Sequence, residues 1–371
     1  MLMRVLHILS PQPPGETGGA DLHVADLAAA QLAGGLVRPA ILELGDKGYA
    51  RTLTGWEIPA ATVADPYHVS VISEVSDAIC RVSPDIVHTH GYDADLLGIA
   101  GWLRSPQPRP AMIATMHGLI WTPAGNFVKT SAMLAALRLA ADAVIVTSRQ
   151  RAVQLQRMFP ASRLHYIANG VQIVPRPHQR TPERQPVIGY VGRLSAEKGV
   201  HRVIEVCAAL ADRIPGLTCR IVGSGDEEAR LRELSARLRV TSRVQFVGLA
   251  TDIAAELSRI DVLLLLSDTE GTPRAVVEAM AARVPIVATR VGGVPDLVRD
   301  QVDALLVRPD DVAAAVAAVQ QVIESPAQAE ALARAAFHRY TTEFTIEHMH
   351  DSVMAVYEQV TRRSLLVPRH E

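Results

Sequence analysis

Short runs of consecutive apolar residues recur along the chain and alternate with longer stretches in which apolar residues recur at helical spacing. In the first half the runs are Val5–Leu9, Ala40–Leu44, Asp85–His88, Met112–Met116 and Ala143–Thr147. Continuous apolar character indicates strands buried on both faces, which is typical of parallel sheets covered by helices. The pattern therefore predicts a doubly wound, Rossmann-like α/β domain over residues 1–174.

A second series of the same kind follows a proline-rich segment. Residues 175–186 contain several prolines, which neither continue a helix nor fit a central strand, so this segment reads as a linker. Apolar runs then recur at Val187–Val191, Thr218–Val222, Val244–Val247, Val262–Leu266, Ile286–Thr289 and Ala304–Val307. Helical stretches lie between them at Val200–Ile214, Glu227–Arg239, Ala275–Arg283 and Val312–Glu324. We expect a second doubly wound α/β domain over residues 187–345.

The last helical stretch, Ile346–Thr361, is apolar on one face, and the pattern does not say which domain that face packs on. In doubly wound folds ligands bind beyond the carboxyl ends of the strands. With two such domains facing one another, the natural place for an active site is a cleft between them. Attention therefore falls on the residues that come directly after strands.

Composition narrows the class of protein. The chain has 371 residues, of which 49 % are hydrophobic, enough to fill two cores, and its net charge of −2 gives no basic field for nucleic acid. No apolar run approaches the roughly 20 residues that span a bilayer. The first apolar run enters a Pro/Gly loop rather than a cleavage site, which favours a strand over a signal peptide. These features predict a cytoplasmic protein.

Three cysteines, Cys80, Cys207 and Cys219, are too far apart in sequence for zinc-ligand spacing. Each lies near apolar residues. We expect buried structural thiols in a reducing compartment.

The segment that follows the run ending at Leu266 carries the first candidate site. A polar loop with Glu270 and Gly271 leads to Thr272, which suits a helix cap, and Pro273, which suits a first helical turn. Backbone N–H groups at a helix start favour an anionic or hydroxyl-rich ligand. Glu278 lies among apolar residues, where a ligand diol would supply hydrogen-bond partners. The alternative is an exposed glutamate paired with Arg274 or Arg283.

Two further segments follow strands of the second domain. Arg193 and Lys198 flank a helix start near Ser195 and together suit a diphosphate, although single cations of this kind are common on surfaces. Gly223 and Gly225 form half of a dinucleotide fingerprint, but the third glycine is missing and acidic residues follow. For this segment we favour a turn and helix cap near the ligand.

The first domain offers glycines and histidines. Gly18 and Gly19 precede a helix and allow a phosphate to approach its N-terminus, unless they belong to a mobile loop. His88 and His90 alternate near the end of one strand, and His117 follows another. One or two of them would donate to a sugar hydroxyl or phosphate. A metal is not expected, because no third ligand lies nearby in sequence.

Taken together, these motifs resemble the family-4 retaining glycosyltransferases of the GT-B fold along almost the entire chain. The resemblance rests on GGADLHVADLA, VHTHG, MHG, NGV, GRLSAEKG, VGSGDE and EGTPRAVVEAMA followed by VPIVATRVGGVPDLV. No single motif is specific, but their order over two domains is. The resemblance implies a sugar transfer from a nucleotide diphosphate sugar to a glycan, lipid-linked or small-molecule acceptor.

The resemblance also implies roles for residues of the second domain, which would bind the donor, whereas the first would bind the acceptor. Arg193 and Lys198 would bind the donor diphosphate and stabilise the charge that develops on it. Glu270 would hold hydroxyls of the transferred sugar, with backbone N–H groups of Gly271, Thr272 and Arg274 around Pro273. Glu278 would hydrogen-bond the ribose, and Gly223 would lie at the donor.

In the first domain His117 would lie near the transferred sugar, and Gly18 and Gly19 would approach donor phosphates or acceptor. The final segment, about 346–371, would cross back onto this domain. Family-like enzymes retain the anomeric configuration without an evident carboxylate nucleophile and look independent of metal or other cofactors. Two departures from the family pattern, Gln172 after NGV and Arg283 after EAMAA, remove none of these contacts.

Two other functions fit the same architecture. One is a nucleotide-sugar epimerase, and the other is a binding module that has kept the pocket without turnover. The segment from Gly118 to Ala140 contains Trp121 and Phe127 with Lys129 and Arg138, so it could meet a lipid-linked acceptor or the inner face of a membrane, or simply line the acceptor site. The base, sugar and acceptor are not readable from the sequence.

Overall fold

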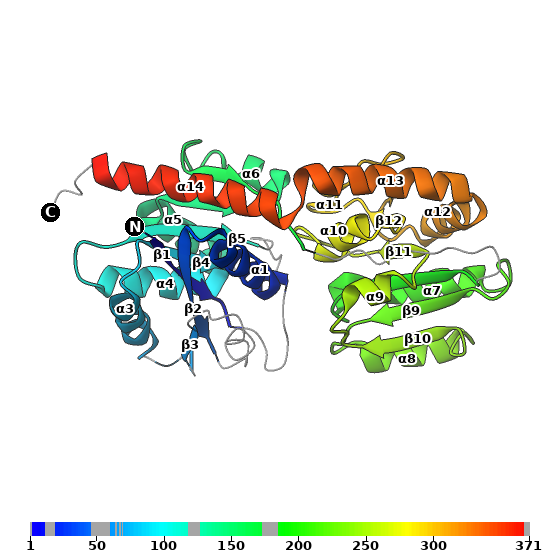
Figure 1. Cartoon of the computed structure of the whole chain (residues 1–371). Helices are drawn as coiled ribbons and strands as arrows, with labels where there is room; N and C mark the ends of the chain where they lie inside the picture. The colour runs from blue at the N-terminus through cyan, green and yellow to red at the C-terminus, as the bar shows by residue number, and fades with distance from the viewer. Residues whose placement is uncertain are drawn as a thin grey trace. The chain divides into compact units, whose positions relative to one another are not determined.

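A computed structural model describes residues 2–11, 19–45, 60–63, 65–66, 68, 70–117, 127–172 and 185–366, with backbone alone for 127–129 and 363–366. The chain forms two compact units (Figure 1). Unit 1 comprises Met1–Gly170 and Ile346–Glu371, and unit 2 comprises Val171–Thr345. Among the described residues no helix is both long and apolar enough to cross a membrane.

Unit 1 contains a seven-stranded, fully parallel sheet in the order β3-β2-β1-β4-β5-β6-β7. Its strands are β1 Met3–Leu9, β2 Val37–Leu44, β3 Ala60–Val63, β4 Ile86–His90, β5 Ala111–Met116, β6 Ala143–Val146 and β7 Leu164–Tyr166. Strand order reverses between β1 and β4, which is the switch point at which doubly wound sheets bind ligands.

Helices cover both faces of this sheet. They are α1 Gly19–Gly34, α3 Val71–Val82, α4 Tyr92–Arg104, α5 Phe127–Ala140, α6 Arg149–Leu155 and α14 Ile346–Leu366. Successive strand residues face opposite sides, so Leu6 and Val87 join one core with residues of α3, α4 and α5. Val5 and Ile86 join a second core with residues of α1 and α14.

The last helix, α14, belongs to unit 1 although it follows unit 2 in sequence. It packs on α1 and β5 (Figure 1). Its buried residues Met349, Val353, Val356, Tyr357 and Val360 repeat at three- and four-residue spacing and form one stripe. The apolar face seen in the sequence is therefore buried against the sheet of unit 1.

Unit 2 contains a six-stranded, fully parallel sheet in the order β10-β9-β8-β11-β12-β13. Its strands are β8 Val187–Val191, β9 Thr218–Val222, β10 Val244–Gly248, β11 Val262–Leu265, β12 Ile286–Thr289 and β13 Leu305–Val307. The order reverses between β8 and β11. The expected pair of doubly wound α/β units is thus confirmed.

The helical elements of unit 2 fall into two groups. They are a short 3-10 turn at Ala196–Lys198, α7 Val200–Leu210, α8 Glu228–Arg237, α9 Ile253–Leu257, α10 Arg274–Ala281, α11 Val294–Leu297, α12 Val312–Glu324 and α13 Pro326–Glu343. Helix α7 contacts α8 and α12, whereas α10 contacts α9, α11 and α13. Each group of helices shields apolar strand residues from water.

Several local expectations need correction. The sequence pattern does not predict strands β3 and β7, because both are short and partly exposed and carry no continuous apolar run. Helix α13 is not predicted either. Cys207 and Cys219 are buried, as expected, but Cys80 is exposed. It lies on the polar side of α3, beside the exposed Asp77 and Arg81, so its apolar neighbours in sequence are not its neighbours in space.

Arg283 stands where the family pattern has glycine, and its backbone shows why. It follows the last turn of α10 with a φ of 56°, a left-handed conformation that favours glycine. Its guanidinium lies 4.1 Å from the ring centroid of Phe337 on α13. The cation–π contact offsets part of the backbone strain. Arg283 therefore has a packing role between α10 and α13.

We predict that Arg283→Ala destabilises unit 2 more than Arg283→Gly. Alanine loses the contact with Phe337 and keeps the strained φ, whereas glycine loses the contact and relieves the strain, a difference of about 1 kcal/mol. Urea unfolding of both variants measures it. Equal stability of the two variants would contradict the prediction.

Candidate functional site

Several of the residues singled out in the sequence lie beyond the carboxyl ends of strands near the switch point of each sheet. In unit 2, Arg193 follows β8 and Glu270 follows β11, and these two strands are neighbours. In unit 1, His117 follows β5, next to β4. Because parallel strands end at the same edge, residues far apart in sequence come together there.

Lys198 and Glu270 form an ion pair. The Lys198 Nζ donates to both carboxylate oxygens of Glu270, at 2.9 and 2.8 Å. Ser267 Oγ donates to Glu270 Oε1 at 2.7 Å. Glu270 is only 6 % exposed, so its charge needs such partners. The structure thus brings together Lys198, which we expect to bind the donor diphosphate, and Glu270, which we expect to hold the transferred sugar.

The loop that carries Glu270 packs closely on its neighbours. A Cβ on Gly292, whose φ is 51°, would lie 1.8 Å from the Glu270 backbone oxygen, so only glycine fits there. Arg202 Nη1 donates to the Leu266 backbone oxygen at 2.9 Å, and Arg202 forms an ion pair with Asp268 at 2.6 Å. The Glu270 carboxylate is therefore positioned by a rigid backbone.

Arg193 is more exposed than Lys198. Its side chain is 49 % exposed and lies 3.4 Å from a Glu197 carboxylate oxygen, a contact worth little in water. Tyr190 Oη donates to the Arg193 backbone oxygen at 2.7 Å, which fixes the main chain and leaves the guanidinium fork at the surface. An exposed guanidinium fork of this kind matches the oxygens of a diphosphate.

Glu278 is buried but has a protein partner. It is 7 % exposed, and Arg274 Nε donates to Glu278 Oε1 at 2.7 Å, one helical turn away. Arg274 thus supplies a partner without a ligand, and the predicted contact of Glu278 with a ligand diol stays a prediction. The alternative was an exposed Glu278 paired with Arg274 or Arg283. The pairing with Arg274 is confirmed, but Glu278 is buried rather than exposed.

The start of α10 also differs by one residue from the expectation. The helix begins at Arg274 with Pro273 in the N-cap position, so Thr272 does not occupy the cap. Proline fits because it has no N–H of its own to satisfy. Gly271, Thr272 and Pro273 form the turn between Glu270 and the helix, and their predicted contacts with the donor stay predictions.

The backbone N–H of Gly223 already donates a hydrogen bond within the protein. It donates to the Gly248 oxygen at 2.8 Å, and a Cβ on Gly223 would lie 1.9 Å from the Gly192 oxygen. The glycine therefore allows the loops after β8 and β9 to touch, which places Arg193. The expected helix cap is not made by a side chain, since Glu227 at the N-cap of α8 makes no capping hydrogen bond.

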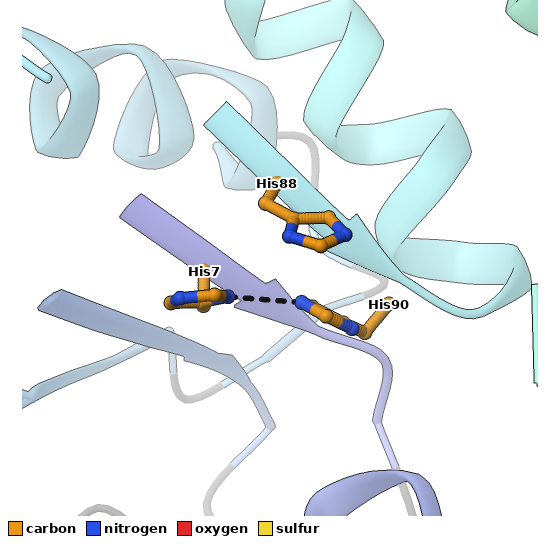
Figure 2. Close-up of side chains that lie close together, drawn as sticks. All are labelled: His7, His88 and His90. Carbon is orange, nitrogen blue, oxygen red and sulfur yellow. Dashed lines mark hydrogen bonds between the residues drawn. The ribbon is translucent and has the colours of Figure 1, made fainter. Parts of the chain in front are cut away.

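Unit 1 gathers histidines from three elements. His7 on β1 and His88 and His90 on β4 point toward one another, and Figure 2 shows the contact between His7 Nδ1 and His90 Nε2, which are 3.0 Å apart. His90 Nδ1 lies 3.3 Å from His117 Nε2. The ring of His23, in the first turn of α1, packs edge-on against His117 with centroids 4.6 Å apart.

Polar side chains from the surrounding helices and strands complete this network. Gln31 Oε1 on α1 lies 3.0 Å from His7 Nε2. Tyr357 Oη on α14 lies 2.7 Å from His88 Nδ1, and Thr115 Oγ1 on β5 lies 2.7 Å from His88 Nε2. Each imidazole in β1 and β4 thus has partners at both nitrogens.

Burial keeps these imidazoles neutral. Removal from water lowers the pKa of His7 and of His117 to about 4. Burial, reinforced by the neighbouring histidines, also lowers the pKa values of His88 and His90. A neutral imidazole attracts a phosphate weakly, so this cluster suits hydroxyl groups better than anions.

We expected no metal because no third ligand lies near His88 and His90 in sequence, but a third ligand does lie near them in space. Two sets of three histidines have ligand atoms within 4.8 Å of one another, namely His7, His88 and His90, and His23, His90 and His117. The third ligand comes from β1 or α1, which the spacing within β4 cannot reveal. Because His7, His88 and His90 are hydrogen-bonded at both nitrogens, they need no cation to satisfy them. The absence of a metal stays a prediction.

Some of the other predicted residues lie outside the part of the chain that the structure describes. Gly19 begins α1, whereas Gly18 lies outside the described residues. In the segment proposed for acceptor or membrane contact, Trp121 and the side chains of Phe127 and Lys129 also lie outside. Arg138, which is described, donates to the Met158 backbone oxygen.

Sequence reasoning missed the residues that hold the predicted ones in place. Ser267 and Arg202 fix Glu270, while His7, Gln31 and Tyr357 surround the histidines of β4. Ser267 follows β11 directly, so its position after a strand was a usable signal. His7 lies inside an apolar run, and nothing in its local sequence indicates its partners.

Comparison with known proteins gives matches over both units. The sequence model of the Glycosyltransferase Family 4 matches residues 17–174, and that of Glycosyl transferases group 1 matches residues 172–339. A glycogen synthase from Mycobacterium tuberculosis is 30 % identical over 288 residues, covering 74 % of this chain and 68 % of the relative.

A D-inositol 3-phosphate glycosyltransferase from Jonesia denitrificans is 26 % identical, covering 93 % of this chain and 92 % of the relative. Among solved structures, the Anabaena protein Alr3699/HepE in complex with UDP-glucose superposes with a TM-score of 0.83 at 20 % identity, covering 96 % of this chain and 99 % of that one. This likeness shows a shared fold over nearly the whole chain.

The histidine cluster predicts a loss of stability in mild acid. A pKa lowered by folding means that the folded protein binds fewer protons than the unfolded chain, so stability present above about pH 6.5 is lost as the pH falls toward 4. His117→Gln removes one such group. Between these pH values the free energy of unfolding of the wild type should fall more steeply than that of the variant, by up to about 1.4 kcal/mol per pH unit.

The difference between wild type and variant reports His117 together with its effect on His88 and His90, whose pKa values His117 helps to lower, whereas groups outside the cluster cancel. Asp95, whose pKa burial raises to about 8, acts in the opposite direction in both proteins. Parallel curves of unfolding free energy against pH would contradict the prediction.

Proposed function

The chain belongs to the family-4-type glycosyltransferases of the GT-B fold, and on this basis we propose that it transfers a sugar from a nucleotide diphosphate sugar, with retention of anomeric configuration. The acceptor would be a glycan, a lipid-linked saccharide or a small molecule. Since the Anabaena protein of the same fold was crystallised with UDP-glucose, UDP-glucose is the first donor to test.

The observation that supports this proposal best is the ion pair of Lys198 and Glu270 beyond β11. An ammonium has three donors, and two of its hydrogen bonds go to Glu270, which leaves about one for a phosphate oxygen. The carboxylate, fixed also by Ser267, keeps lone pairs for sugar hydroxyls. The Lys198–Glu270 pair can thus bind both the diphosphate leaving group and the transferred sugar.

Charge develops on the diphosphate as the glycosidic bond breaks, and fixed cations lower the free energy of that transition state. Lys198 is held by Glu270, so it needs no reorganisation when the charge appears. Arg193, with its exposed fork, would close on the same diphosphate. Arg274 and Glu278, which lie one turn apart on α10, would then lie toward the nucleoside.

Retention requires that the acceptor attack from the face that the diphosphate leaves, unless a nucleophile on the protein intervenes. Glu270 is a poor nucleophile here, because Lys198 and Ser267 already hold its oxygens. We therefore propose a front-face substitution through an oxocarbenium-like state. The departing phosphate oxygen would accept the proton of the acceptor hydroxyl.

Membrane contact and metal independence remain proposals of lower priority. A lipid-linked acceptor would bring the chain to the inner face of a membrane without a spanning helix. The reaction as proposed uses Lys198 and Arg193 in place of a cation at the diphosphate. Addition of a chelator should leave its rate unchanged.

We predict that Glu270→Gln and Lys198→Met each lower kcat/KM for UDP-glucose hydrolysis or transfer by on the order of a hundredfold or more. Glutamine weakens the hold on Lys198 and on the sugar, and methionine removes the cation. Release of UDP and the anomeric configuration of the product, read by proton NMR, are the measurements. Epimerised donor without free UDP would contradict sugar transfer.

A matched control separates loss of function from loss of fold. Glu256 is as buried as Glu270, at 7 %, and accepts from Arg220 Nη2 at 2.6 Å in the same unit. Arg220 lies beside Val187 and Thr218, the first residues of β8 and β9, at the opposite edge of the sheet. Glu256→Gln should lower stability but keep kcat/KM. Equal losses of activity in the Glu256 and Glu270 variants would count against the proposed site.

A further inference from the structure

The histidines of unit 1 form a chain of hydrogen bonds that begins at a residue of fixed polarity. Gln31 is fully buried, and its Nε2 donates to Tyr357 Oη on α14 at 3.3 Å. Its other atom, Oε1, lies 3.0 Å from His7 Nε2. A carbonyl oxygen accepts only, so His7 carries its proton on Nε2.

The proton on His7 Nε2 sets the direction of the hydrogen bonds that His90 and His117 make further along the chain. A neutral His7 protonated at Nε2 has an acceptor at Nδ1, so His90 Nε2 donates to it across 3.0 Å. His90 then accepts at Nδ1, and His117 Nε2 donates to it across 3.3 Å. The chain leaves His117 with a bare lone pair on Nδ1.

A second branch agrees with the same direction. Tyr357 Oη accepts from Gln31, so its own proton is available for His88 Nδ1, 2.7 Å away. His88 Nε2 then donates to Thr115 Oγ1 at 2.7 Å. The orientation of the Gln31 amide, with Nε2 toward Tyr357 and Oε1 toward His7, therefore sets the direction of both branches.

The end of the chain is an unsatisfied acceptor. His117 Nδ1 is buried and has no hydrogen-bond partner among the described residues. Leaving such an atom without a donor costs about 1–3 kcal/mol, so a ligand that brings a donor is favoured. His117 follows β5 directly, at the edge where ligands of this fold bind.

We propose that Gln31, His7 and His90 are positioning residues that fix the tautomer of His117, so that its Nδ1 accepts a hydrogen bond from a hydroxyl of the transferred sugar. This rests on the proposed function. It differs from the sequence-based expectation, in which a histidine donates to a hydroxyl or phosphate. Tyr357 anchors the amide, so α14 takes part in setting the site of unit 1.

Nitrogen-15 NMR of the whole chain, labelled at histidine, tests the direction without any need for turnover. Protonated and bare imidazole nitrogens have distinct shifts, and single histidine-to-glutamine variants assign them. We expect His7, His90 and His117 to be neutral with the proton on Nε2. A proton on His117 Nδ1, or zinc retained by the cluster in the purified protein, would overturn the proposal.

Steady-state kinetics tests whether the tautomer of His117 affects reaction of the sugar donor. Gln31→Leu should lower kcat/KM for the sugar donor by roughly three- to tenfold, the value of one neutral hydrogen bond, and should mix the His117 tautomers. Gln31→Glu, which still offers an acceptor to His7, should restore both. Gln359→Leu, on α14, removes only an exposed hydrogen bond to Ser162 and should change neither.

Deoxy analogues of the donor identify the contact. For the analogue that lacks the hydroxyl bound by His117, wild type and Gln31→Leu should have equal kcat/KM, whereas the other analogues keep the difference. A difference that persists with every analogue would overturn the assignment of a hydroxyl to His117. Absence of turnover with intact tautomers in the wild type would instead count against the proposed donor.

Discussion

A carboxylate that is almost fully withdrawn from water must find its counter-charge where it lies, and for Glu270 that counter-charge is Lys198. The pair joins the turn after β8 to the loop after β11, the two strands between which the order of the sheet reverses. Breaking a pair of this kind by removing one partner costs several kcal/mol, so the two loops are tied together. Ser267, Gly292 and Arg202 keep the backbone around it in one arrangement.

Unit 1 obeys a different constraint at the equivalent edge of its sheet. The buried histidines there are neutral, and each must therefore be matched donor to acceptor rather than charge to charge. The Tyr357 hydroxyl and the Gln31 amide start two chains of such matches through the histidines of β1 and β4. A charged ligand group thus suits the residues of unit 2, and an uncharged hydroxyl suits those of unit 1.

Much of the fold is readable from the sequence, because parallel strands buried on both faces leave continuous apolar runs. The edge strands β3 and β7 are not readable, since partly exposed strands of three or four residues carry no such run. The candidate site divides in the same way. Lys198 and Glu270 follow strands and could be named in advance, but that they bind each other depends on strand order, which no local pattern contains.

Residues that act through others were the hardest to foresee. His7 lies within an apolar strand, and Tyr357 lies on a helix of which the sequence shows only an apolar stripe. The partners of His7 lie 24 and 83 residues away in sequence and those of Tyr357 lie 269 and 326 residues away, so only the packed structure reveals them. The burial of Glu278 shows the reverse case, in which the apolar neighbours were informative and the ligand was not needed to satisfy the charge.

The role of the Lys198–Glu270 pair in holding a sugar diphosphate is tested most directly by a crystal structure of the chain with UDP-glucose. We expect Lys198 Nζ to lie about 3 Å from a phosphate oxygen while it still contacts Glu270, with a sugar hydroxyl donating to the Glu270 carboxylate. Diphosphate and glucose bound away from both side chains would contradict this assignment.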